Sequence, residues 1–176
     1  PGLNSYSRLE DHYNIEKPGQ YSGQGSLLYR QITGDDGAIF PDFPNLSNQW
    51  DTGAEYVAVY PNVLLGAQRD HCFVIILEPV SQSQTREHIH LYYATHNTDD
   101  ALRQKNAALW KTVFIEDIFV VEGMQKGRLA PDFDGGKFSP AMDGPTHCFH
   151  DWAATRVCAL RAQAQQQTQQ PAQAAE

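Results

Sequence analysis

Three strand-like runs constrain the fold of this chain more than any other feature. They read EYVAVYP, DHCFVIILEP and TREHIHLYYATH, at residues 55–61, 70–79 and 85–96. Each is rich in β-branched and aromatic residues and is bounded by turn residues. The short polar link VSQSQ, residues 80–84, is typical of a hairpin loop, so the runs predict an antiparallel meander. One further strand is expected over residues 26–32.

After residue 97 the sequence pattern becomes that of a helix. Thr98 is placed to cap a helix over residues 101–127, with a break expected near Lys111. Residues 130–145 are rich in Gly, Pro and Asp, which indicates a loop. A last helix is expected from about residue 146 to 163. Strands followed by helices predict an α+β fold in which a long C-terminal helix packs on an antiparallel sheet.

Composition excludes several classes of protein. The chain has 13 Lys and Arg against 21 Asp and Glu, and a net charge of −8, which argues against nucleic acid and anionic membrane surfaces as partners. No apolar run approaches the roughly 20 residues of a membrane helix. Three cysteines without a C-x-x-C pair, and the lack of a signal peptide, favour a cytoplasmic protein. We expect one domain over residues 1–164 and a disordered Gln/Ala-rich tail over residues 165–176.

The most informative residue is Asp117. On a helix with about 100° between residues, Trp110, Phe114 and Val121 fall within about 60° of Asp117, so this carboxylate lies in the apolar stripe. Glu122 falls outside that stripe. A carboxylate that faces a core must be hydrogen-bonded, protonated or bound to a metal. The pattern leaves open both a hydrogen-bonded buried acid and a functional one.

The histidines allow a second hypothesis. His88 and His90 alternate on a predicted strand, so they share one face, and with Asp117 they form a candidate two-His, one-carboxylate Fe(II) site. Their H-x-H spacing is similar to the cupin metal motif. Ordinary strand positions are the competing interpretation. His147 and His150 are better explained by packing or by a helix start.

Longer strings resemble a known family. EYVAVYPNVLLG, a strand that ends in LEP, VFIEDIFVVEGMQKGRLAP and THCFHDWAA resemble the C-terminal catalytic domain of Rieske non-haem iron oxygenases, the α subunits of aromatic ring-hydroxylating dioxygenases. The most specific piece is E-D-x-x-x-x-E-x-x-Q at residues 116–125. The resemblance implies a helix-grip (START-like) fold and an oxidoreductase that hydroxylates an aromatic or other small organic substrate with O₂.

The resemblance also implies a set of cofactors and partners. Asp117 would be the carboxylate ligand of a mononuclear Fe(II), and electrons would come from NAD(P)H through a reductase, and in some relatives a ferredoxin, to a [2Fe–2S] cluster. A homotrimer or an α3β3 assembly is implied as well. The family's D-x-x-H-x-x-x-x-H segment and the cluster motif C-x-H with C-x-x-H do not occur among the 176 residues. We therefore expect this chain to be the C-terminal part of a longer subunit and inactive by itself.

Candidate pocket residues follow from position on the strand and turn at residues 56–66 and on the helix. They are Tyr56, Asn62, Leu64, Gly66, Trp110 and Val113, each of which also suits core packing. Three hypotheses remain open: the oxygenase domain, a non-catalytic helix-grip module that binds an apolar small molecule, and a cupin-like metalloprotein.

Overall fold

The computed structural model describes residues 9–169. Within that range the chain forms one antiparallel sheet and two long helices, joined by short 3₁₀ turns and loops. In chain order the elements are η2 (Leu9–Asp11), β1 (His12–Lys17), β2 (Tyr21–Ser26), η3 (Asn48–Asp51), β3 (Ala54–Val59), β4 (Val63–Ala67), β5 (His71–Ser81), β6 (Gln84–Tyr93), α1 (Asp100–Arg128) and α2 (Gly144–Gln169).

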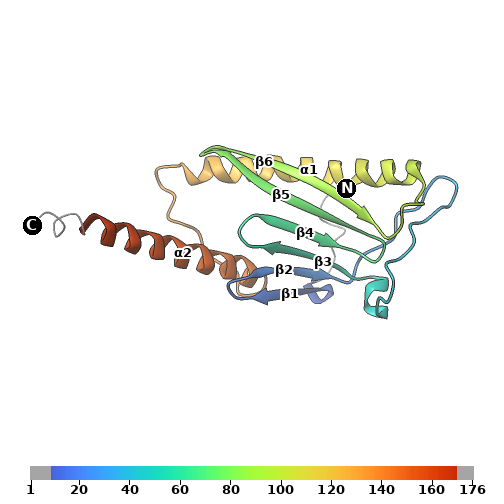
Figure 1. Cartoon of the computed structure of the whole chain (residues 1–176), viewed down its shortest axis with the longest axis horizontal. Coiled ribbons are helices and arrows are strands. Elements are labelled where there is room, and N and C mark those ends of the chain that lie inside the picture. Colours follow the sequence, from blue (N-terminus) through green and yellow to red (C-terminus); the bar gives the residue numbers. More distant parts are fainter. Residues whose placement is uncertain (1–8, 170–176) are drawn as a thin grey trace, which may run out of the picture.

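The described strands lie side by side in sequence order, β1 to β6, and every neighbouring pair is antiparallel (Figure 1). The predicted meander and the α+β, helix-grip class are therefore confirmed. The strand expected over residues 26–32 is wrong, because the first hairpin is formed earlier, by β1 and β2. Residues 63–67 form β4, a strand that we did not predict separately.

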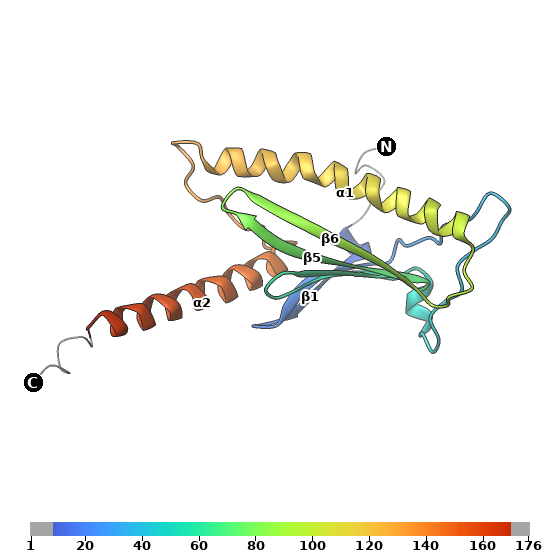
Figure 2. The same cartoon turned by 45° about the horizontal axis from the view of Figure 1, so that its top comes forward.

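Helix α1 is one continuous helix, so the break expected near Lys111 does not occur. Its N-cap is Asp99 rather than Thr98, and the Asp99 carboxylate accepts a hydrogen bond from the backbone N–H of Ala101 at 3.1 Å. A capping carboxylate satisfies one of the free N–H groups in the first turn. In the two ribbon views α1 runs along one side of the sheet, over β5 and β6 (Figures 1 and 2).

Helix α2 is fixed to the opposite end of the sheet by its first turn. Ser22 Oγ donates a hydrogen bond to the carbonyl of Pro145 at 2.7 Å, and Gln24 Nε2 donates one to the carbonyl of Met142 at 3.0 Å. The rest of α2 extends away from the sheet (Figure 2). The helix continues through residues 165–169, where we expected a disordered tail, and the rest of that tail lies outside the described residues.

The core is small and aromatic. Phe73 and Ile75 of β5 pack against Trp110 of α1, with Leu64 and Phe114 at the edge of the cluster. Only the first half of α1 has buried side chains, and its second half stands over the sheet without packing closely against it. No helix in the described part of the chain is long and apolar enough to cross a membrane.

Candidate active-site cavity

A cavity of about 1950 Å³ separates the sheet from α1. The inner faces of β2 to β6 form its floor, α1 forms its roof, and the start of α2 closes one end. Its aromatic lining residues are Tyr56, Phe73, Trp110, Phe114 and Phe149. A concave, mainly apolar space with a few polar groups is the usual form of a small-molecule site.

Asp117 lies on the wall of this cavity, in the second half of α1. Its side chain is exposed, so the expectation of a carboxylate facing a packed core is wrong: it faces open space instead. Phe114 and Trp110 lie one and two turns earlier on the same helix face, and the step from Trp110 to Asp117 is about 10 Å along the axis. This stretch of α1 therefore places a carboxylate beside an aromatic wall.

The cavity-facing side of α1 is turned relative to the stripe read from the sequence. Ile118 and Glu122 line the cavity. Val113 and Met124, which the helical spacing of the sequence puts within about 40° of Asp117 on its other side, do not. Asp117 is thus near one edge of this face rather than at its centre. The interpretation of Glu122 as a residue outside the stripe is wrong, because Glu122 is a second carboxylate of α1 on the cavity wall.

Three of the predicted pocket residues, Tyr56, Leu64 and Trp110, line the cavity. Asn62 is used by the fold, because its Nδ2 donates a hydrogen bond to the carbonyl of Leu77 at 2.9 Å. Gly66 lies directly beneath the ring of Phe73, which occupies the place that a side chain would take. The substrate-binding roles of all six candidates stay predictions.

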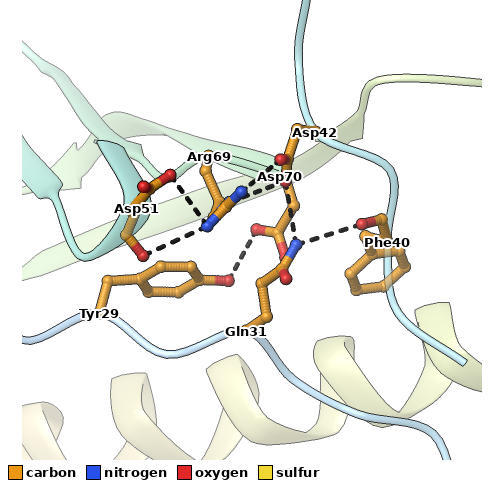
Figure 3. Close-up of polar contacts among 7 residues, drawn as sticks. All are labelled: Tyr29, Gln31, Phe40, Asp42, Asp51, Arg69 and Asp70. Carbon is orange, nitrogen blue, oxygen red and sulfur yellow. Dashed lines mark hydrogen bonds and ion pairs between the residues drawn. The ribbon is translucent and has the colours of Figure 1, made fainter. Parts of the chain in front are cut away.

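Sequence reasoning missed a chain of buried hydrogen bonds behind the aromatic wall. The indole Nε1–H of Trp110 donates to Nε2 of His71 at 2.8 Å, and Nδ1 of His71 is 2.8 Å from Oδ1 of Asp70. The hydroxyl of Tyr29 donates to the same Asp70 oxygen at 2.7 Å (Figure 3). Burial and this hydrogen bond to Asp70 raise the pKa of Tyr29 far above its usual value. The one sequence signal for this hydrogen-bond chain was the adjacent pair Asp70 and His71 at the start of a predicted strand.

The cupin-like hypothesis is wrong in this fold. Ile89 and Leu91 line the cavity, so His88 and His90, which alternate with them on β6, point to the other face of the sheet. His88 instead binds Glu78, with Nε2 and Oε2 2.7 Å apart, which holds the pKa of that carboxyl below its usual value. These histidines therefore cannot join Asp117 in one site.

The other histidine pair has a packing role, as expected. His147 and His150 of α2 each meet the ring of Phe138 edge-on, with ring centroids 5.2 Å apart in both cases. Across residues 9–169, no three His, Cys, Asp or Glu side chains come close enough to hold a metal ion. A two-His, one-carboxylate iron site needs three such ligands, and the described residues do not bring three together.

An antiparallel sheet with a long helix over a mainly apolar cavity defines the chain as a helix-grip domain. The family model described as "Ring hydroxylating alpha subunit (catalytic domain)" matches residues 4–159. The chain therefore belongs to the family of ring-hydroxylating oxygenase α subunits, through their catalytic domain. No protein in the comparison with curated sequences matches it.

Proposed function

We propose that this chain is the catalytic-domain portion of a Rieske-type oxygenase that hydroxylates an aromatic or other small organic substrate with O₂. The observation that carries the proposal is the position of Asp117, a carboxylate on an aromatic-lined cavity within the region that the family model matches. Tyr56, Leu64 and Trp110 would contact the substrate, and the apolar wall would keep water away from it.

The proposal assigns Asp117 as one protein ligand of a mononuclear non-haem Fe(II). The described residues do not form a complete iron site, so the remaining ligands would come from outside them. By family membership we further propose a [2Fe–2S] cluster outside this sequence, electrons from NAD(P)H through a reductase or ferredoxin, and a cytoplasmic homotrimer or α3β3 assembly. Sequencing the gene upstream of the Pro1 codon tests these parts first, through the two cysteine–histidine motifs and the spaced histidine pair.

Metal analysis of variants tests the role of Asp117. In the protein expressed from its complete gene, Asp117→Ala should remove the mononuclear iron while the visible absorbance of the cluster remains. Glu116→Ala is the matched control, because Glu116 is the adjacent carboxylate and does not line the cavity. The variant Glu122→Ala tests the other carboxylate of α1 that lines the cavity. Retention of full iron by Asp117→Ala, or its loss only in Glu122→Ala, would contradict the assignment.

A non-catalytic module that binds an apolar molecule is the second candidate, favoured by the apolar lining of the cavity itself. The two functions differ in one measurement. A binding module should bind its ligand with full affinity in an iron-free preparation and form no product. An oxygenase should form hydroxylated product only when iron and reductant are restored.

A further inference from the structure

The hydrogen-bond chain behind the aromatic wall has a fixed direction. An indole N–H can only donate, so Nε2 of His71 must accept the hydrogen bond from Trp110. The proton of a neutral His71 is then on Nδ1, from which it donates to the Asp70 carboxylate. A single tautomer of His71 satisfies both partners, and Asp70 selects it.

The middle of the chain, Asp70 and His71, is shielded from water. Asp70 is 0% exposed and His71 is 2% exposed. The rings of Phe40 and Tyr93 lie near the imidazole of His71, with centroids 6.1 and 6.4 Å away. Hydrogen bonds in such surroundings have no competing water, and a buried partner left unpaired is costly. The geometry of the chain is therefore held tightly.

The far end of the chain is a cavity-wall residue. Trp110 lines the cavity, and its ring meets that of Phe73 at 63°, with centroids 4.6 Å apart. Aromatic packing alone leaves an indole free to turn over, because either edge can contact a neighbouring ring. The hydrogen bond to His71 removes that freedom, since it fixes which edge of Trp110 points away from the cavity.

We propose that Asp70 and His71 are positioning residues that fix the indole ring of Trp110 and thereby orient an aromatic substrate relative to Asp117. The inference rests on the proposed function, because it assumes that the cavity takes an aromatic molecule. Neither Asp70 nor His71 lines the cavity, so both act through Trp110.

Two readouts on the same variants test the proposal. The first is nitrogen-15 NMR of the His71 ring and of the Trp110 indole N–H. The second is the affinity for nitrobenzene, an aromatic quencher, measured by the fluorescence of Trp110 in a background in which Trp50 and Trp152 are replaced by Phe. Trp110 is the only tryptophan of the described residues that lines the cavity.

The main variant is Asp70→Asn. The Asn amide can present its NH₂ group to Nδ1 of His71 and shift the ring proton to Nε2, where it opposes the indole N–H. The expected result is a changed His71 tautomer, a displaced indole resonance and nitrobenzene binding weaker by about tenfold, the effect of losing one buried hydrogen bond. A purely structural role would not reverse the tautomer.

Two further variants keep the test decisive. Tyr29→Phe removes only one hydrogen bond to Asp70 and leaves the carboxylate that selects the His71 tautomer. It should therefore keep the tautomer and give a smaller displacement of the indole resonance and a smaller loss of nitrobenzene affinity, even if Asp70→Asn folds poorly. Asp42→Asn is the control, because Asp42 is a nearby carboxylate that binds Arg69 and Gln31 instead (Figure 3). It should leave both readouts unchanged.

The possible outcomes separate the inference from the function beneath it. An unmoved indole resonance, or nitrobenzene affinity within twofold of the parent in both Asp70→Asn and Tyr29→Phe, would overturn the positioning role alone. No quenching of the parent protein by nitrobenzene would instead contradict the proposed aromatic site, whatever the NMR spectra show.

Discussion

Gly66 does not line the cavity, but replacing it by Ala should change the shape of the cavity by displacing Phe73, which does. A Cβ atom at Gly66 would lie 2.2 Å from Cε1 and 2.3 Å from Cζ of Phe73, its cross-strand partner. Non-bonded carbon atoms prefer about 3.5–4.0 Å, so the ring must move by more than about 1 Å. Phe73 is 5% exposed and packs on Trp110 and Phe114. The displaced ring of Phe73 can therefore move only into the cavity. Overpacking of this kind costs about 1–3 kcal/mol.

Urea denaturation followed by circular dichroism measures that cost, and nitrobenzene quenching of Trp110 measures the change of cavity shape. Two comparisons make the result specific. Combining Gly66→Ala with Phe73→Leu should recover part of the stability lost by each single variant, because the smaller side chain removes the clash. Gly123→Ala should instead stabilise the protein by about 1 kcal/mol, since a Cβ at this exposed helical position meets no atom within 4 Å.

A Gly66→Ala variant as stable as the parent would refute this reasoning, as would additive losses in the double variant. Either result would mean that Phe73 does not lie against Gly66. The expected result would give Gly66 a definite part in the site: it shapes the cavity by leaving room for Phe73, without contacting the substrate.

Three further predictions concern stability. Gln68 is 2% exposed, and neither polar atom of its side chain has a hydrogen-bond partner among the described residues. Gln68→Met should therefore raise the unfolding free energy by about 1–2 kcal/mol. A decrease of similar size in the unfolding free energy would show that bound water satisfies the amide. The Arg69 guanidinium lowers the pKa of Asp42, so this ion pair stabilises the fold above the unfolded-state pKa, about 3.9, and the effect disappears as the pH falls through the lower folded-state pKa. Because Asp42 is partly exposed, the ion pair should contribute less than about 1 kcal/mol to the unfolding free energy. The parent should be more stable than Asp42→Asn at pH 5, and this difference should shrink at pH 3. An equal difference in unfolding free energy at both pH values would contradict the prediction. Asp99→Ala should cost about 1 kcal/mol through loss of the helix cap, and an unchanged urea midpoint would show that Thr98 caps instead.

The strands that sequence predicted are those whose residues carry their own signal. β3, β5 and β6 are rich in β-branched and aromatic residues, and their expected positions agree closely with the structure. β2 reads YSGQGS and has no such signal. It forms because β1 and β3 pair with it on both sides, and because Ser22 and Gln24 bind the start of α2 and the loop just before it. Those contacts are tertiary, so a local pattern does not show them.

The buried hydrogen-bond chain was unpredictable for a related reason. Tyr29, Asp70, His71 and Trp110 come from three separate segments, and each has an ordinary explanation when it is read alone. His71 stood at the start of a strand, and Tyr29 lay within the strand that we expected over residues 26–32. The four side chains meet only where the turn between β4 and β5, the segment of residues 27–53 and α1 come together.

The side of α1 on which Asp117 lies depends on the same hydrogen-bond chain. Over its second half α1 is apolar on nearly every side, with Phe119 83% and Val121 63% exposed, so hydrophobic periodicity gives this part of the helix only a weak direction. The last buried residue of α1 is Trp110, whose indole is bonded to His71. Seven residues turn a helix through almost two full turns, which brings Asp117 back to within about 20° of Trp110. Fixing Trp110 therefore fixes the side of α1 on which Asp117 lies, and the carboxylate faces the cavity because the indole two turns earlier is held against the sheet.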